Sequence, residues 1–336
     1  MKLLGILITI ICFLLLVTGH EFGHFSVAKI LGMRVNEFSV GMGPKIWQKQ
    51  KGETKYSLRA VPLGGYCMLE GDENESDDPR SFSVQPAWAK ILVFLAGPFV
   101  NVVIGILMFA AIFCYVGTPI SKLAAVVPGS PAEMMGIQAG DTIKAVDGAY
   151  YDDFTSIRNA IQCAKGHTIK ITFERNGREH TVDCGYTQAD DGSRSIGIYA
   201  TSSHDFGDCL KAGVRETAVV ALDVKNFISS LFKGNAHLGD VSSVVGVVAV
   251  AGDMAETGGL INVIYLIALV SANLGYMNLL PIPALDGGRI LFTIIRCFVK
   301  GEKVARIEAV FNTLCLILLL LLSAIIIFKD IIGLIL

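Results

Sequence analysis

The stretch that decides the fold is LLGILITIICFLLLVTGHEFGHFSVAKIL, residues 3–31. It begins with a charge-free apolar run and continues into the HExxH motif His20-Glu21-Phe22-Gly23-His24. Residues 3–17 alone have the length of a secretory signal peptide, but no small-x-small cleavage site follows them. Residues 18–31 can extend the run to the roughly 20 residues that cross a bilayer. We therefore predict a membrane-spanning helix that ends in a metal-binding motif.

The composition of the whole chain is typical of a membrane protein. Of its 336 residues, 52% are apolar and only 17% are charged. Three further charge-free stretches, 91–116, 260–285 and 309–328, are long enough to span a bilayer. A net charge of −2, without basic runs that alternate with aromatics, gives no reason to expect a nucleic-acid partner. The expected fold is a polytopic α-helical membrane protein with four transmembrane helices that lie in the lipid bilayer.

The positions of the basic residues predict the orientation of these helices. Basic residues gather in two segments, at Arg34, Lys45, Lys49, Lys51, Lys55 and Arg59, and at Arg289, Arg296, Lys300, Lys303 and Arg306. The positive-inside rule places both segments in the cytoplasm. Because the number of spans is even, both termini and the long segment after residue 116 are then expected outside it.

The segment 118–190 is expected to form a small β-rich domain inserted between the two halves of the membrane core, 1–117 and 260–336. Its expected strands are 122–127, 142–146, 168–174 and 179–184, separated by turn signals such as Asp147-Gly148 and Asn176-Gly177. One helix is expected at 152–164. A linker at 191–259 is expected to contain a surface helix at 206–232.

The HExxH motif suits a zinc site. In a helix, His24 lies about 40° from His20 and Glu21 about 100° from it, so the three side chains share one face. Two imidazoles can bind one Zn²⁺ while the carboxylate lies beside its open position. The alternative is that the histidines only snorkel at the membrane interface. That alternative does not explain the glutamate, and polar groups beside an apolar span are costly unless they are paired or bound.

A third ligand is expected from NLGYMNLLPIPALDGG, residues 273–288. Its prolines and glycines must break the helix, which a membrane tolerates only where the backbone faces protein or a water-filled cavity. Asp286 is the candidate ligand, and the open alternative is that it caps a helix that restarts there. Asn273 and Asn278 lie near the same depth. Either can bind the substrate backbone or the developing oxyanion, or form interhelical hydrogen bonds instead.

These parts together predict peptide-bond hydrolysis. Zinc acidifies a water molecule and polarises a carbonyl. Glu21 can accept the proton of that water and return it to the leaving amine. Two other functions are alternatives: a membrane adaptor with an inactive metal site, and a transporter with broken helices. No inverted pair of broken spans supports the transporter, and the intact motif counts against the adaptor.

With residues 20–24 in the first span and 278–288 in the third, the chain closely resembles the site-2 protease family, specifically bacterial RseP-like intramembrane metalloproteases with one PDZ domain. The resemblance implies that His20, His24 and Asp286 bind zinc, that Glu21 is the general base, and that Asn278 contacts the substrate or the transition state. Asn273 matches a second asparagine of the family. The implied function is regulated intramembrane proteolysis of transmembrane substrates, such as anti-sigma factors or signal-peptide remnants. The implied location is the inner (cytoplasmic) membrane.

Three other segments are similar to parts of that family. Residues 35–70, with Gly41 and Gly43, resemble its membrane-associated β-hairpins, which imply strand addition by an unwound substrate; the alternative is a plain loop. Gly97-Pro98-Phe99-Val100-Asn101 is similar to its GPxxN motif, with a helix kink as the alternative. Residues 122–183 are similar to an extracytoplasmic PDZ domain, implying that peptide termini bind between 123–127 and 154–164. His167 and His180 are interpreted as surface residues of that domain.

Overall fold

The computed structural model describes residues 2–72, 76–164, 166, 168–188, 192–235, 242–257, 259–299 and 302–335. His167 lies outside the described residues, whereas His180 is exposed as expected. The chain divides into two compact units. The helical unit comprises Met1–Phe109 with Gly213–Leu336, and the sheet unit comprises Ala110–Ala212.

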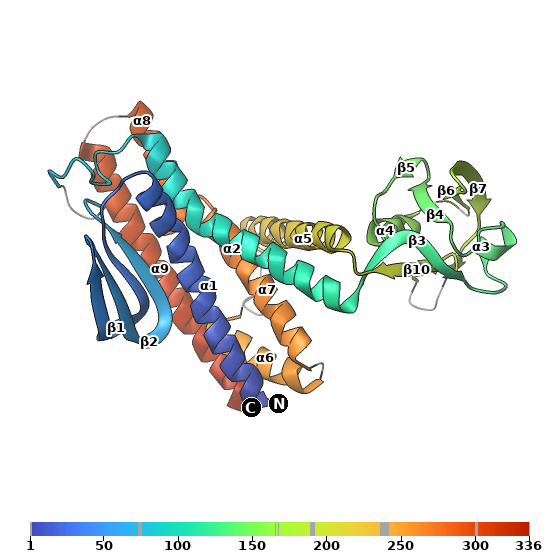
Figure 1. The fold of residues 1–336 in the computed structure, drawn as a ribbon, viewed down its shortest axis with the longest axis horizontal. Coiled ribbons are helices and arrows are strands. Elements are labelled where there is room, and N and C mark those ends of the chain that lie inside the picture. Colours follow the sequence, from blue (N-terminus) through green and yellow to red (C-terminus); the bar gives the residue numbers. More distant parts are fainter. Residues whose placement is uncertain are drawn as a thin grey trace. The chain divides into compact units, whose positions relative to one another are not determined.

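Four long apolar helices build the helical unit (Figure 1). They are α1 (Lys2–Ile30), α2 (Ala87–Val116), α7 (Gly259–Asn278) and α9 (Glu302–Ile335). Each contains a stretch that is long and apolar enough to cross a membrane. The beginning of α1 and the end of α9 lie at the same end of this unit, which agrees with an even number of spans (Figure 1).

The expected break after the third span is present. Helix α7 ends at Asn278, and a helix restarts as α8 (Asp286–Phe298). Pro281 and Pro283 lie in the non-helical connection, where they cannot donate the backbone hydrogen bonds that a continuous helix requires. The connection places Asp286 at the first residue of the new helix.

A short apolar helix, α6 (Val244–Thr257), was not expected, because its 14 residues are too few to span a bilayer and were assigned to the linker. It packs against α1, α7 and α9. Its small residues Ala251 and Ala255 are buried, so one face of this helix packs against protein. Asp330 of α9 holds its beginning, accepting hydrogen bonds from the Ser243 backbone amide and hydroxyl at 2.7 and 2.6 Å. Helix α5 (Phe206–Phe232) has the expected bounds.

The hairpin region expected at 35–70 forms an antiparallel pair, β1 (Val35–Lys51) and β2 (Thr54–Leu69), beside α1 (Figure 1). Both strands bend, so the first half of β1 pairs with both halves of β2, and Phe38 faces Tyr56 on one side and Cys67 on the other. Residues 65–69 therefore form an edge of this folded sheet, which we call the edge segment. The Arg59 guanidinium holds the bend of β1 by donating to the Gly43 carbonyl at 2.8 Å and to Glu37 at 2.9 Å.

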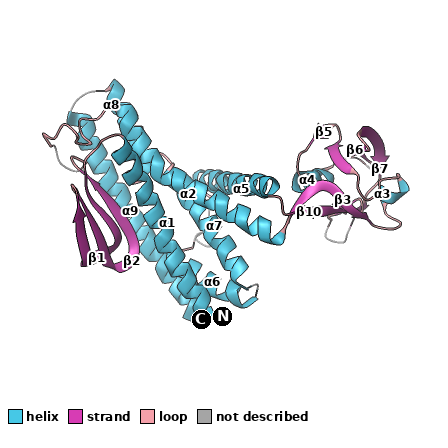
Figure 2. Cartoon of the chain, viewed as in Figure 1, coloured by secondary structure: helices cyan, strands magenta, loops and turns pink. Residues whose placement is uncertain are grey.

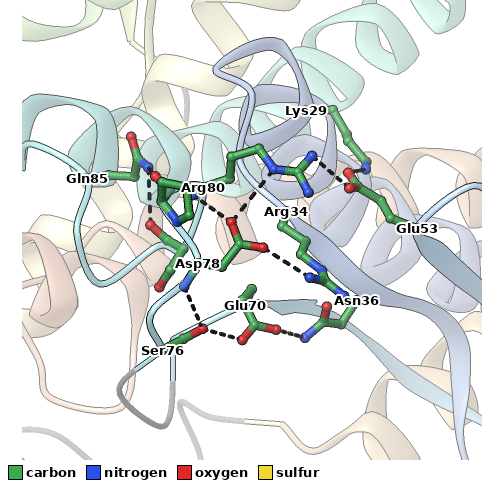
Figure 3. A network of polar contacts seen from close by, with 11 residues as sticks. Lys29, Arg34, Asn36, Glu53, Glu70, Ser76, Asp78, Arg80 and Gln85 are labelled. Atoms are coloured by element: carbon green, nitrogen blue, oxygen red, sulfur yellow. Dashed lines mark hydrogen bonds and ion pairs between the residues drawn. The ribbon is translucent and has the colours of Figure 1, made fainter.

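A network of ion pairs ties this sheet to the end of α1 and to the segment before α2 (Figure 3). Glu53, at the tip of the β1–β2 hairpin, lies 2.6 Å from the Lys29 ammonium of α1 and 2.8 Å from the Arg80 guanidinium. Asp78 accepts a hydrogen bond from Arg34 at 3.0 Å. The network fixes the hairpin and the following loop to the helix that carries the HExxH motif.

The sheet unit contains a sheet with the strand order β10-β3-β4-β6-β7 (Figure 2). The strands are β3 (Thr118–Val126), β4 (Thr142–Val146), β6 (Ile169–Arg175), β7 (Arg178–Cys184) and β10 (Ile198–Ser203). A two-residue strand, β5 (Ala149–Tyr150), pairs with β4, and β8 (Thr187–Gln188) pairs with β9 (Arg194–Ser195). The short helix α3 (Pro131–Met134) follows β3, and α4 (Phe154–Cys163) packs against the sheet.

Two expectations about this unit change. The expected boundary at 190 falls inside the fold, because β10 pairs along the whole of β3. For the same reason residues 123–127 cannot border a groove that accepts a peptide strand: β3 already has β10 on one side and β4 on the other. That expectation is wrong by one strand, and the edge strand beside β3 is β10.

Candidate metal centre

Three side chains from two distant parts of the chain converge in the helical unit. His20 and His24 lie one helical turn apart on α1, and their Nε2 atoms are 3.2 Å apart. The Asp286 Oδ2 atom lies 3.1 Å from His20 Nε2 and 3.5 Å from His24 Nε2. No side-chain hydrogen bond caps the start of α8, so the Asp286 carboxylate faces the imidazoles and does not cap the helix.

This triangle of donor atoms fits a zinc ion. Zinc bonds of about 2.0–2.1 Å in tetrahedral geometry place ligand atoms about 3.3 Å from one another. The three observed separations, from 3.1 to 3.5 Å, bracket that value. Burial opposes ionisation of Asp286, but hydrogen bonds from both imidazoles hold the pKa of its carboxyl well below the usual value. Two nitrogens and one carboxylate oxygen leave the fourth position open, as catalytic zinc requires.

Glu21 lines the same cavity, which has a volume of about 250 Å³. The cavity is also lined by His20, His24, Asn278 and Asp286. The edge segment borders it closely: a Cβ atom at Gly65 would lie 3.5 Å from Glu21 Cγ, and Glu21 interacts with the backbone of Cys67. Burial and the nearby Glu21 raise the pKa of the Cys67 thiol to about 12, so this thiol stays neutral at physiological pH.

The other expected substrate contacts lie elsewhere. Asn273 lines two different cavities, which it shares with Val270 and Met277 of α7. Gly41 and Gly43 lie at the bend of β1, where a Cβ atom on either would meet Val61 of β2. Of the four residues expected to bind substrate, only Asn278 lines the cavity that contains Glu21.

One face of α2 supports the two imidazoles. The sequence did not predict this role for the GPxxN segment. Val93 accepts a hydrogen bond from His24 Nδ1 at 2.7 Å, and the Asn101 amide lies 3.3 Å from His20 Nδ1. Gly97 lies between them, and a Cβ atom there would stand 2.4 Å from His24 Nε2. The four-residue spacing of 93, 97 and 101 places all three on one helix face, a signal visible in the sequence.

Arg289 and Asp72 were also missed. Both line the cavity with Glu21, and both line a second cavity of about 520 Å³ that continues along the edge segment. Their side chains form an ion pair at 3.1 Å. Arg289 lies one turn after Asp286 on α8, a spacing that places both side chains on the same helix face.

The sheet unit has a groove of its own, about 220 Å³ in volume. It lies between α4 and the chain that enters β10, and its lining includes Phe154, Arg158, Ile161, Arg194, Ile196 and Ile198. Two arginines thus lie beside apolar side chains in this groove. Opposite α4 the groove is bordered by β9 and by Ile196 and Ile198, where the chain enters β10, and its lining includes none of 123–127.

Comparisons with known proteins identify relatives that match almost the whole chain. The family model for peptidase family M50 matches residues 8–322. A protein of Clostridium perfringens named as a zinc metalloprotease is 35% identical over 331 residues, which are 97% of this chain and 98% of that protein. Zinc metalloprotease RasP of Geobacillus kaustophilus is 27% identical over 96% of each chain. The PDZ domain of an SdrC-like protein from Listeria innocua is 26% identical over 26% of this chain and 99% of that domain, with a TM-score of 0.22.

The match to the family model covers most of the chain, from the apolar run before the HExxH motif to the last apolar helix. Together with the identity to the clostridial relative, it confirms the resemblance seen in the motifs. The chain therefore belongs to peptidase family M50, the site-2 proteases, and is a membrane zinc metalloendopeptidase.

Proposed function

We propose that this chain cleaves other membrane proteins within or beside the bilayer, with zinc held by His20, His24 and Asp286. The observation that carries the proposal is the convergence of Asp286 Oδ2 with the two Nε2 atoms, beside Glu21, on α1, a helix that is apolar enough to cross a membrane. The zinc ion supplies an acidified water and a Lewis acid for the scissile carbonyl.

Glu21 is proposed as the general base. Its carboxylate shares the cavity with the three ligands, which is the position from which it can accept a proton from the attacking water. The same carboxyl group then returns the proton to the leaving amine. Because Glu21 acts together with the zinc ligands, its loss is expected to reduce the rate of cleavage by orders of magnitude.

The substrate is proposed to enter along the edge segment. An unwound strand that pairs with residues 65–69 would pass beside Glu21, because Gly65 and Cys67 border its side chain. Asn278 is proposed to contact the substrate backbone or the oxyanion from the other side of the cavity. Gly41 and Gly43 are proposed to act by shaping the bend of the sheet. Asn273 is proposed to contact a membrane-spanning part of the substrate, since it lines cavities away from Glu21.

The proposed location is the inner membrane, with the β1–β2 hairpin in the cytoplasm and the sheet unit, as a PDZ domain, outside it. The basic residues of the hairpin support this orientation. Protease added to intact spheroplasts should then cut within the sheet unit and spare the hairpin. Cleavage of the hairpin in intact cells would reverse the proposed orientation.

The proposed substrates are transmembrane substrates such as anti-sigma factors or remnants of signal peptides. Full-length Glu21→Gln protein should trap them, because the amide preserves the shape of the site and leaves the zinc ligands intact. Membrane proteins that copurify with this variant in larger amounts than with the wild type are the candidates for direct cleavage assays.

The test of the proposed function compares Glu21→Gln with Glu256→Gln, an exposed glutamate of α6, in purified full-length protein. Both variants should retain one zinc per chain. Cleavage of a transmembrane reporter should fall by about 10²–10⁴-fold in Glu21→Gln only. Near-normal cleavage by Glu21→Gln would overturn its role, and a wild-type protein without stoichiometric zinc would indicate an adaptor instead of a protease.

A further inference from the structure

Asn101 is a polar residue in the middle of the apolar helix α2, and its side chain is completely buried. Its amide Nδ2 lies 3.3 Å from His20 Nδ1. Its amide oxygen Oδ1 is also buried and has no hydrogen-bond partner in the described part of the chain. Such an unpaired oxygen in an apolar interior is costly, so its position calls for a donor that approaches it in some state of the protein.

The backbone holds Asn101 in place independently of its side chain. Its carbonyl oxygen accepts a hydrogen bond from the Ser271 hydroxyl of α7 at 2.8 Å, and Ser271 is fully buried. This contact joins α2 to the helix that leads into Asp286. The Asn101 amide can therefore turn about its side chain without moving the helix.

The zinc site dictates where the protons of the two imidazoles must lie. An imidazole that binds a metal through Nε2 carries its hydrogen on Nδ1, and that hydrogen needs an acceptor. His24 has one, because its Nδ1 lies 2.7 Å from the Val93 carbonyl, which can only accept. The Nδ1 of His20 faces the Asn101 side chain, whose nitrogen is also a donor.

Two hydrogen-bond donors cannot face each other in this buried contact. A half-turn of the Asn101 amide exchanges Nδ2 for Oδ1 and places the unpaired oxygen against the His20 Nδ1 hydrogen. In the structure Asn101 Nδ2 faces His20 Nδ1, and His20 Nε2 lies 3.1 Å from Asp286 Oδ2. Both contacts are satisfied by the tautomer in which Nε2 carries the hydrogen and Nδ1 accepts.

We propose that Asn101 is a positioning residue that sets the tautomer of His20, donating to Nδ1 in the zinc-free protein and accepting from Nδ1 when zinc is bound. An amide offers a donor and an acceptor at the same place, so it satisfies both tautomers. Leucine satisfies neither, and aspartate satisfies only the tautomer that binds zinc. The inference rests on the proposed role of His20 as a zinc ligand.

The test measures the zinc dissociation constant of full-length protein in detergent, by competition with a chromophoric chelator. Partners that orient a metal-binding histidine typically contribute 10- to 100-fold to metal affinity. Asn101→Leu should therefore bind zinc about 10- to 100-fold more weakly than the wild type. Asn101→Asp should retain affinity at or above the wild-type value. Ser271→Ala, which removes the neighbouring contact without touching His20, should stay within about threefold of the wild type.

Equal weakening by Asn101→Leu and Asn101→Asp would show that packing, not hydrogen-bond acceptance, matters at this position, and would overturn the inference. Wild-type affinity in Asn101→Leu would overturn it as well. If the leucine variant does not fold, Asn101→Ala takes its place, because it removes the acceptor without adding volume. If His20→Ala bound zinc as tightly as the wild type, the proposed metal site itself would be refuted. The failure of this inference and the failure of the proposed function are therefore distinguishable.

Discussion

The Arg289 guanidinium lies 3.1 Å from the Asp72 carboxylate and also covers the ring of Phe94, with its Cζ 5.3 Å from the ring centroid. Asp72 lies three residues after the edge segment, and Arg289 belongs to the helix that begins with Asp286. Both residues line the cavity with Glu21 and the larger cavity beside it. The ion pair therefore joins α8 to the segment after β2 where the two cavities share their lining.

Asp72→Asn should weaken this connection between α8 and the segment after β2. The two side chains are 20% and 43% exposed, so the pair is worth at most about 1 kcal/mol. We expect zinc removal by a chelator and cleavage of a short soluble peptide to accelerate by no more than about fivefold. Asp78→Asn, which disturbs the Arg34 contact in the same loop, is the matched control. A loss of cleavage greater than tenfold would show that Asp72 contacts the substrate instead.

Gly97→Ala should release zinc. The added Cβ atom would stand 2.4 Å from His24 Nε2 and 2.8 Å from His20 Cε1, so the imidazoles must move away from the positions that converge on Asp286. Gly105→Ala lies two turns later on α2 and meets Ala272 at 3.2 Å, so it tests tight helix packing without touching the imidazoles. The zinc content of each variant is measured by elemental mass spectrometry. It should fall in Gly97→Ala and stay unchanged in Gly105→Ala. Equal zinc content in both variants would refute the proposed support by α2.

The elements found from the sequence share a periodic or compositional signal. Long apolar runs gave the four spans, HExxH gave a shared helix face, and the two prolines after Asn278 gave the helix break. Each depends on residues close together in the chain. The depth at which His24 and Asp286 meet could also be anticipated, because a membrane forces helices of similar length to end at similar levels.

The features that were missed depend on which surfaces meet. Helix α6 has the length of a core helix, and only the contacts of α1, α7 and α9 explain why it is buried. In the sheet unit, the edge strand beside β3 comes from 198–203, within the segment expected to be a linker, because β10 returns to pair with β3. Register and strand order of this kind are set by long-range pairing, which local patterns do not encode.

Glu37 should make the stability of the β1–β2 sheet depend on pH, but only at acidic pH, below about 5. Burial raises the pKa of Glu37, but hydrogen bonds from Ser57, Arg59 and Tyr66 outweigh it and lower the pKa to about 2. The unfolded value is about 4.3. Because the folded pKa is the lower one, the stabilisation is complete above about pH 5 and is lost as the pH falls toward 2.

Glu37→Gln should therefore reduce the hydrogen-exchange protection of the sheet amides at pH 7 by the equivalent of about 1–3 kcal/mol. The difference from the wild type should stay constant between pH 5 and 8 and shrink below about pH 4. Glu256→Gln serves as the control, since that side chain is exposed on α6. A difference that grows on acidification would mean that Glu37 is protonated in the folded sheet.

The last prediction concerns the sheet unit, which is expected to screen substrates and to take no part in the chemistry. Deleting residues 118–203 removes the whole sheet, whereas deleting 122–183 leaves β10 with only residues 118–121 of its partner β3. The larger deletion should preserve cleavage of a short, pre-trimmed substrate and increase cleavage of a substrate with an intact ectodomain. The smaller deletion should misfold, because an unpaired edge strand invites aggregation.

A point variant separates peptide binding from simple exclusion by size. Arg158→Ala removes one of the two cations that line the groove beside β10 and leaves the size of the unit unchanged. If the groove captures a carboxylate-terminated peptide, this variant should bind a fluorescent peptide acid at least tenfold more weakly, while the peptide amide should bind weakly to both proteins. If the unit acts only by its size, Arg158→Ala should cleave every substrate at the wild-type rate. Loss of activity toward the short substrate, in a 118–203 deletion that still inserts and holds zinc, would show that the sheet unit is required for catalysis.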